Sequence, residues 1–209
     1  MLPSIVLASA SPARLKLLQS AGISPTIRVS TVNEELAVES KGWTAPRDIA
    51  LGLAILKAED VANSDLNAPV IVIGCDSVME QSGVPLGKPE NVSVAKERLQ
   101  ALSGSFGTLH TGHSVIYCSE GENVMISRLV STDVYFHELT DAEIDAYIRT
   151  NEPLKVAGSF TLDALGAPFI KSISGDASNV VGLSLPTLRL ILKELGFGWD
   201  EVLKNVTVE

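Results

Sequence analysis

One run of residues limits most strongly what this chain can fold into. Residues 69–74, Pro-Val-Ile-Val-Ile-Gly, are apolar almost throughout and lead directly into Cys75, Asp76 and Ser77. A strand that is apolar on both faces is usually buried under helices on each side. The run is also much shorter than the roughly 20 residues of a membrane-spanning helix. It therefore predicts a buried central strand, ending at Cys75-Asp76-Ser77, inside an α/β fold.

The remaining signals alternate between strand and helix before they change to a hairpin. Expected strands cover residues 5–8, 25–30, 69–74, 113–117, 124–137 and 167–173. Expected helices begin near residues 13, 46, 95, 140 and 185. Alternating strands and helices favour parallel pairing and a hairpin is antiparallel, so we expect a mixed sheet flanked by helices. No repeat or linker divides the chain, which we expect to form a single domain over residues 1–209.

The charge balance excludes several classes of partner. The 209 residues carry 16 Lys and Arg against 25 Asp and Glu, a net charge of −9. Such a chain has no general field that attracts DNA, RNA or an anionic membrane, although a few local cations can still hold a small phosphorylated ligand. Two cysteines are too few for a disulfide framework, and no signal peptide is visible. We therefore expect a cytoplasmic protein.

The first turn of the chain is a candidate phosphate site. Ser9, Ser11 and Arg14 lie where the first expected strand feeds the first helix. A helix N-terminus offers free backbone N–H groups and a positive dipole to a phosphate, and hydroxyl and guanidinium groups would add hydrogen bonds and charge. The alternative is that Ser11 only caps the helix, as serine commonly does.

Further charged residues suggest triphosphate chemistry. Asp76 follows the buried strand, where ligands of α/β sheets gather, and Lys88 lies in a Gly-Lys-Pro turn. A nucleoside triphosphate carries about four negative charges and needs a metal ion and cations to be bound and attacked. Glu34 and Asp76 are candidate ligands for Mg²⁺ or Mn²⁺, and Arg14, Lys57 and Lys88 are candidate phosphate partners. The structural alternative is a turn cap for Asp76 and a solvated side chain for Glu34, Lys57 and Lys88.

Sequence motifs of other common phosphate-binding, catalytic and metal sites are absent or incomplete. There is no G-x-x-x-x-G-K-[ST] loop, and no G-x-G-x-x-G follows the first strand. The segment Gly182-Leu183-Ser184-Leu185-Pro186 resembles a nucleophile elbow but lacks its final glycine. His110 and His113 have no third histidine or carboxylate cluster beside them in the sequence, so we expect surface or strand histidines rather than metal ligands.

Short tags in a common order resemble the Maf family of nucleotide pyrophosphatases over nearly the whole chain. In the first half the matching segments are Leu7-Ala8-Ser9-Ala10-Ser11-Pro12-Ala13-Arg14-Leu15 for L-A-S-x-S-P-R-R, Val32-Asn33-Glu34 for V-D-E, Lys57-Ala58 for K-A, Gly74-Cys75-Asp76-Ser77-Val78 for G-x-D-[TS]-V and Gly87-Lys88-Pro89 for G-K-P. In the second half they are Leu102-Ser103-Gly104 with Thr111-Gly112, Glu152-Pro153-Leu154 with Ala157-Gly158, and Gly175-Asp176 with Asn179-Val180-Val181-Gly182-Leu183. So many tags in the correct order make chance agreement improbable.

The resemblance implies an elongated mixed α/β fold of the Maf and ITPase-like kind, with two lobes around a central cleft. It also implies divalent-metal dependence, a homodimer, and hydrolysis of nucleoside triphosphates to monophosphate and pyrophosphate. In the matched motifs Asp76 is the catalytic residue, and Glu34 and Asp76 would hold the metal. The residues expected to contact the substrate are Ser9, Ser11, Arg14, Lys57, Lys88 and Asp163.

The chain departs from the family pattern at positions that affect the substrate. Ala13 replaces the first Arg of S-P-R-R, and Val156 replaces the Lys of D-K-A-G, so two candidate cations are missing. The branch specific for dTTP and UTP carries a Tyr and a Gln where this chain has Phe160 and Asp163. The segment is closer to the branch associated with 7-methyl-GTP. The alternative for Asp163 is that it caps a turn and does not meet the nucleotide.

We therefore expect a metal-dependent nucleoside triphosphate pyrophosphatase in which Asp76 accepts a proton from water or binds the metal. One rival is a nucleotide-binding regulator of cell division, because the family is linked with septum formation. Another is a phosphohydrolase that releases orthophosphate. The presence of Asp76, Glu34 and Lys88 favours an enzyme, since binding alone would not demand a positioned base.

Overall fold

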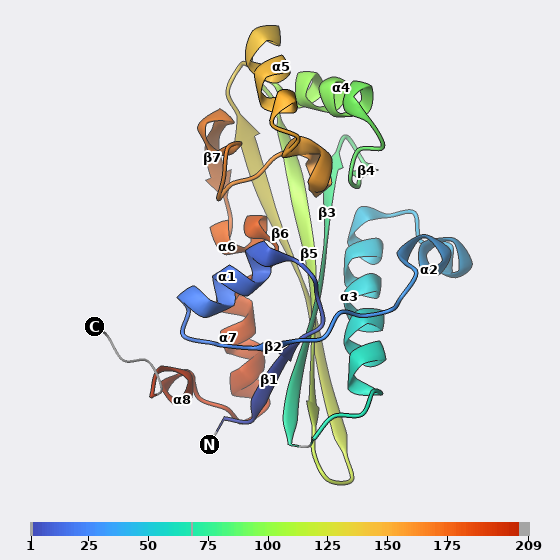
Figure 1. Cartoon of the computed structure of the whole chain (residues 1–209), viewed down its shortest axis with the longest axis vertical. Helices are drawn as coiled ribbons and strands as arrows, with labels where there is room; N and C mark the ends of the chain where they lie inside the picture. Colours follow the sequence, from blue (N-terminus) through green and yellow to red (C-terminus); the bar gives the residue numbers. More distant parts are fainter. Residues whose placement is uncertain (1, 68, 205–209) are drawn as a thin grey trace.

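The apolar run forms the first part of a long central strand. β3 (Val70–Gln81) lies between β1 (Ser4–Leu7), which is parallel to it, and β5 (Phe106–Cys118), which is antiparallel. The computed structural model describes residues 2–67 and 69–204, and within them seven strands form one mixed sheet. Figure 1 shows helices around this sheet, so the expected α/β class with a mixed sheet is confirmed.

The other strands extend the sheet on both sides of this centre. The order is β2-β1-β3-β5-β6-β7, and β4 pairs with β3 outside this series. The bounds are Thr26–Ile27 for β2, Val84–Leu86 for β4, Asn123–Phe136 for β6 and Ile170–Ser174 for β7. β5 and β6 form the expected antiparallel hairpin. Together with β3 they run along the longest axis of the molecule (Figure 1).

The expectation that the central strand ends at residues 75–77 is wrong. β3 continues to Gln81, and its ladder with β5 runs without a break past this point. The polar residues do not end the strand because their side chains find partners outside the ladder: Lys57 for Asp76 and Arg14 for Ser77. The candidate catalytic residue therefore lies within a strand, where the ladder holds its backbone.

Each face of the sheet is covered by its own helices. Alternate side chains of β1 and β3 pack against α1 (Pro12–Ser20) and α7 (Leu185–Glu194) on one face, and against α3 (Pro46–Ala62) on the other. Ile73 belongs to the first group and Val72 to the second. This alternation is why the strand is apolar on both faces.

Shorter helices lie beyond these layers. α4 (Val92–Leu102) and α5 (Asp141–Arg149) pack on each other at one end of the molecule, and α5 begins with the expected capping box (Figure 1). α6 (Ala177–Val181) precedes α7, and α8 (Trp199–Leu203) follows it, so α7 is not the last helix as expected. No helix within residues 2–67 and 69–204 is long and apolar enough to cross a membrane.

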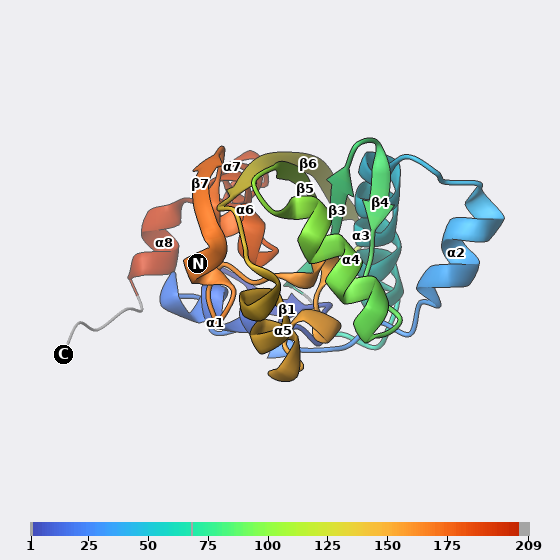
Figure 2. The same ribbon diagram turned by 90° about the horizontal axis from the view of Figure 1, so that it is seen from above.

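Several boundaries differ from the sequence-based expectation. The helix α2 (Glu34–Lys41) was not expected, because none of its residues is buried and it therefore shows no apolar face. It begins at the cap Asn33, and Figure 2 shows it projecting from the body. β2 has two residues instead of the expected six at 25–30. β7 starts at Ile170 instead of Ala167, because a short 3-10 turn comes first.

Candidate active site

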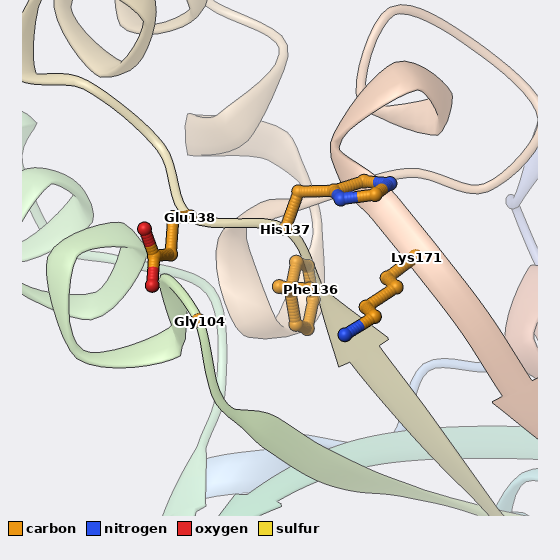
Figure 3. A pocket seen from close by; sticks show the side chains of 5 residues that line it. All are labelled: Gly104, Phe136, His137, Glu138 and Lys171. Atoms are coloured by element: carbon orange, nitrogen blue, oxygen red, sulfur yellow. The ribbon is translucent and has the colours of Figure 1, made fainter.

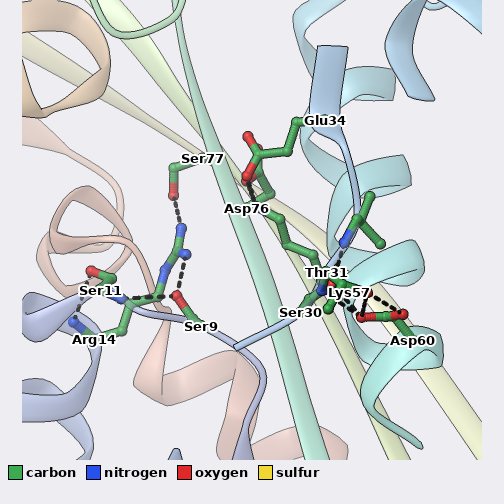
Figure 4. A network of polar contacts seen from close by, with 11 residues as sticks. Ser9, Ser11, Arg14, Ser30, Thr31, Glu34, Lys57, Asp60, Asp76 and Ser77 are labelled. Atoms are coloured by element: carbon green, nitrogen blue, oxygen red, sulfur yellow. Dashed lines mark hydrogen bonds and ion pairs between the residues drawn. The ribbon is translucent and has the colours of Figure 1, made fainter. Parts of the chain in front are cut away.

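One edge of β3 is left without a partner strand over a short stretch. On that edge, β1 pairs with residues 70–73 and β4 pairs with residues 79–81. Residues 74–78 have no partner strand there among the described residues, and we call this stretch the open edge. Asp76 and Ser77 lie within it, and their side chains point to opposite faces of the sheet, as neighbours in a strand must. Figure 4 shows the two resulting polar groups on either side of β3.

The first group is a buried lysine between two carboxylates. Lys57 of α3 places its Nζ 2.5 Å from Asp76 Oδ1 and 2.7 Å from Oε1 of Glu34, the first residue of α2. Asp76 and Lys57 are only 8% and 9% exposed, whereas the Glu34 side chain is 54% exposed. Burial raises the pKa of Asp76 above its usual value, although the charges of Lys57 and Arg14 oppose that effect. The result is a carboxylate that is a stronger base than an ordinary aspartate.

Two glycines bring α3 close enough to make this contact. A Cβ added to Gly74 would lie 2.5 Å from the carbonyl oxygen of Ala54, and a Cβ at Gly112 would overlap the backbone of α3 at Ala50. Gly112 is the direct cross-strand partner of Asp76. The absence of side chains at both positions lets the helix lie directly on the sheet around Asp76.

Asp60, one turn beyond Lys57 on α3, anchors the segment that carries Glu34. Its carboxylate accepts hydrogen bonds from Thr31 N at 2.7 Å, Ser30 Oγ at 2.9 Å and Thr31 Oγ1 at 3.1 Å. The backbone hydrogen bond from Thr31 and the bond from the Ser30 hydroxyl lower the pKa of Asp60. The same helix therefore supplies Lys57 and fixes the approach of Glu34.

The second group surrounds Arg14 on the other face. Its Nε donates to the Gly182 carbonyl at 2.7 Å, its Nη1 to Ser9 Oγ at 3.1 Å and its Nη2 to Ser77 Oγ at 3.0 Å. Ser77 Oγ is in turn 2.9 Å from Thr111 Oγ1. Arg14 is buried, so these bonds fix its guanidinium beside the open edge.

Ser11 takes the capping role that was the alternative for it. Its Oγ accepts from Arg14 N at 3.4 Å, while its own N–H donates to Ser9 Oγ at 3.2 Å. The cap starts α1 at Pro12 and so directs the Arg14 side chain toward β3. A capping hydroxyl at the mouth of a helix can also meet an anion, and the two roles are compatible.

Two predicted site residues are not joined to either group by a polar contact in the described part of the chain. Lys88 is exposed after β4, in a turn whose Gly87 carbonyl accepts from Arg98 Nη1 at 2.6 Å. Asp163 is exposed in the segment between α5 and β7. Sequence reasoning missed Asp60 and did not give Ser77 and Thr111 a role, although both hydroxyls lie in quoted motifs. Asp60 had no signal beyond its three-residue spacing from Lys57.

His110 and His113 lie in β5, as expected for strand histidines, and both are buried. His110 bonds to Glu80 and Ser131, and His113 Nε2 accepts from Ser184 N at 2.7 Å. No group of three or more His, Cys, Asp and Glu side chains in residues 2–67 and 69–204 is placed to hold a metal ion.

The pair Glu34 and Asp76 nevertheless fits a hard divalent cation. Each carboxylate contacts Lys57 through one of its two oxygens. Mg²⁺ is commonly bound by one or two carboxylates together with substrate phosphates and water, so two protein ligands are enough when the phosphate arrives with the ion.

A surface cavity of about 360 Å³ lies elsewhere, lined by Gly104, Phe136, His137, Glu138 and Lys171 (Figure 3). None of the predicted site residues lines it. The open edge is the better candidate, because the buried charged side chains of Arg14, Lys57 and Asp76 lie beside it.

Comparison with known proteins identifies the family of the chain. The family model described as Maf-like protein matches residues 4–195. A protein of Streptomyces coelicolor named nucleoside triphosphate pyrophosphatase is 48% identical over 198 residues, covering 95% of this chain and 93% of the relative. Proteins with the same name from Rhodococcus opacus and Nostoc punctiforme are 44% and 43% identical and cover 95% and 94% of this chain, with 95% of each relative matched. The chain belongs to the family of Maf-like proteins.

Proposed function

We propose that this protein hydrolyses nucleoside triphosphates to nucleoside monophosphate and pyrophosphate at the open edge of β3. The observation that carries the proposal is the buried Asp76, held against Lys57 and Glu34 beside an unpaired strand edge. Relatives with 43–48% identity carry the name of this activity. The chemistry of the site agrees, because triphosphate hydrolysis needs a base, fixed cations and hard oxygen ligands.

The residues of the two groups divide the reaction between them. Asp76 takes the proton of the attacking water, and burial favours this role because it raises the pKa of the carboxyl. Lys57 holds the Asp76 carboxylate in place and supplies positive charge. Arg14 and the Ser9 hydroxyl, which are hydrogen-bonded to each other beside the open edge, would bind the phosphate chain. Water attacks the α-phosphorus. The bond between the α-phosphorus and the oxygen that bridges it to the β-phosphorus breaks, and this oxygen leaves with pyrophosphate.

Glu34 and Asp76 would hold a divalent cation such as Mg²⁺ or Mn²⁺, which would neutralise phosphate charge when bound. A ligand role for Asp76 is the alternative to its role as base. In either case Glu34, which is half exposed, would bind the metal ion on the side of the site that faces solvent. Lys88 adds a further cation, from a turn that Arg98 fixes through the Gly87 carbonyl.

We further infer that residues 1–209 work as one domain in the cytoplasm, as a homodimer, with the substrate cleft of the family at the open edge. The single sheet that passes through the site supports the one-domain inference. The resemblance to the Maf family supports the others. Light scattering of the purified protein tests the homodimer.

Product identification tests the proposed activity against its rivals. A panel of nucleoside triphosphates, including 7-methyl-GTP, is incubated with the protein and Mg²⁺ or Mn²⁺, and phosphate products are separated. Pyrophosphate with nucleoside monophosphate supports the proposal. Orthophosphate would indicate the other phosphohydrolase, and tight nucleotide binding without either product would indicate a regulator.

Base choice is expected to depend on Asp163. A carboxylate only accepts hydrogen bonds, and guanine offers adjacent N1–H and NH₂ donors, whereas thymine and uracil present two carbonyl oxygens around one N–H. We therefore propose a preference for guanine-type or methylated guanine substrates over dTTP. Asp163→Gln should shift the ratio of kcat/KM values toward pyrimidines, and an unchanged ratio would leave Asp163 as a turn residue.

A further inference from the structure

A single carboxylate ties the segment around Asp163 to the rest of the fold. Glu152 directly follows the turn that ends α5, and its side chain accepts four hydrogen bonds. Oε1 accepts from Thr161 Oγ1 at 2.6 Å, Tyr147 Oη at 2.9 Å and Gly166 N at 3.2 Å. Oε2 accepts from Leu165 N at 3.3 Å. Three of these four donors belong to residues 161–166, which we call the 161–166 loop.

This contact is specific for an ionised acceptor. Burial alone would raise the pKa of Glu152, but the hydrogen bonds from Thr161, Tyr147 and the two backbone N–H groups outweigh it and lower the pKa. A carboxylate offers enough lone pairs for all four donors, and two of those donors are backbone N–H groups that otherwise have to find partners in the loop itself.

The loop closes tightly around this anchor. A Cβ added at Gly166 would lie 2.6 Å from Tyr147 Oη and 2.7 Å from the backbone N and O of Thr161. Thr161 Oγ1 also accepts from Gly166 N at 3.1 Å, so the two ends of the loop are joined to each other as well as to Glu152. The loop therefore has one well-defined path.

The chain just before the loop is fixed beside the open edge. A Cβ at Gly158 would lie 2.8 Å from Met79 Cβ on β3, three residues after Asp76. Phe160 is buried, and its ring packs edge-on against Phe136 with a centroid distance of 5.0 Å. Between these packed residues and the Glu152 anchor, Asp163 and Leu165 are exposed.

We propose that Glu152 is a positioning residue for base selection: it holds the 161–166 loop in one conformation, so that the exposed loop residues meet the nucleotide base at a fixed place beside the open edge. The inference rests on the proposed triphosphate hydrolysis. Glu152 itself does not contact the nucleotide. Its carboxylate already accepts four hydrogen bonds from the protein, and it acts on the base only through the position of Thr161, Leu165 and Gly166.

The test combines substrate selectivity with loop dynamics. Glu152→Ala removes all four contacts, Glu152→Gln keeps one accepting oxygen, and Thr161→Val removes the loop hydroxyl with little change in shape. Tyr147→Phe is the matched control, because it removes the one donor outside the loop. Each variant is measured for kcat/KM on GTP and dTTP, for thermal unfolding, and for amide hydrogen exchange in residues 161–166.

We expect Glu152→Ala to bring the ratio of kcat/KM for GTP to kcat/KM for dTTP about tenfold closer to one. This is the change expected when one well-placed hydrogen bond to the base is lost. Glu152→Gln and Thr161→Val should change the ratio in the same direction by less, and Tyr147→Phe should leave it within about twofold. Hydrogen exchange at Leu165 and Gly166 should accelerate in the same order.

Two results would overturn the inference. One is an unchanged ratio in Glu152→Ala and Thr161→Val while the loop amides exchange faster, which would show that the loop does not select the base. The other is unchanged exchange, which would show that Glu152 does not hold the loop. A wild-type protein that releases no pyrophosphate would instead contradict the proposed function, whereas release of pyrophosphate with a fixed ratio contradicts only the role of Glu152.

Discussion

Lys57 Nζ lies 2.5 Å from Asp76 Oδ1, and both side chains are buried between α3 and the sheet. Removing one member of a buried ion pair leaves the other charge uncompensated, which is usually strongly destabilising. Glu34 moderates that effect here, because its carboxylate also reaches Lys57. Variants at this pair must therefore be measured for stability and for rate.

Asp76→Asn should lower pyrophosphate release at least ~10²-fold, as expected for loss of a general base or a charged metal ligand. The amide has nearly the same volume, and Lys57 keeps Glu34 as a partner, so the protein should still fold with a reduced melting temperature. Steady-state kinetics and thermal unfolding check both statements. Asp65→Asn, an exposed carboxylate before β3, is the matched control. Near-normal rates in folded Asp76→Asn protein would contradict the assignment.

Glu34→Gln should raise the Mg²⁺ or Mn²⁺ concentration needed for half-maximal activity, because an amide oxygen is a weaker ligand for a hard cation than a carboxylate. Chelation of divalent metal should stop the reaction. Glu34 is half exposed, so the melting temperature should change little. Metal titrations of both proteins decide the point, and full activity in excess chelator would refute the metal site.

Lys88→Ala should weaken triphosphate binding and turnover together without a measurable loss of stability. Lys88 is exposed in a turn, and exposed lysines rarely contribute much to the free energy of unfolding. Lys193→Ala on the exposed side of α7 is a control of equal charge change. If Lys88→Ala destabilises the fold and leaves the kinetics unchanged, Lys88 is a structural residue.

Gly74→Ala should reduce both stability and activity. The added methyl group would meet the Ala54 carbonyl and Ala58, so α3 must move away from β3. Overpacking of this kind costs about 1–3 kcal/mol in free energy of unfolding, and displacement of α3 separates Lys57 from Asp76. Chemical denaturation and pyrophosphate release measure the two effects. A destabilised variant with the wild-type rate would show that the close approach of α3 serves packing alone.

His113 should make stability depend on pH below neutrality. Burial first, and the positive charge of Arg14 second, lower the pKa of His113 from 6.5 to about 4. The unfolded chain therefore binds a proton near pH 6.5 while the folded protein does not, so the free energy of unfolding falls as the pH drops from 6.5 to about 4. The expected loss is about 3 kcal/mol over that interval.

The comparison that isolates this effect uses His113→Gln, which keeps an acceptor for the Ser184 N–H but does not titrate. Urea unfolding at pH 7, 5.5 and 4 should show a smaller loss of stability in the variant than in the wild type. Equal losses would assign the acid sensitivity to other groups.

The sequence predicted the class of fold because its strongest signals are local. The apolar run of β3, the hairpin of β5 and β6, and the capping box at Thr140 depend on residues that are close in the chain. The predicted end of β3 is too early because a polar residue after an apolar run, here Asp76, is typical of a strand end. The partner of Asp76, Lys57, comes from another element, and no local pattern shows that contact.

The candidate site follows the same division. Motifs identified Asp76, Lys57 and Arg14, because the order of short tags is visible in one dimension. Which groups these residues touch was not visible, since Arg14 reaches Gly182 across 168 positions of the chain. Asp60 was missed for the same reason, because its role depends on contacts with Ser30 and Thr31, which are about 30 positions away in the sequence.

The open edge of β3 also has a consequence for how the protein behaves in concentrated solution. An unpaired strand edge offers backbone N–H and C=O groups to any extended segment of another molecule, which is how sheets aggregate. Here the edge is short, is closed at both ends by β1 and β4, and has an ion pair beside it. A second strand added there would have to desolvate those charges. The same charged residues that we propose to receive a nucleotide thus disfavour edge-to-edge pairing with other copies of the molecule.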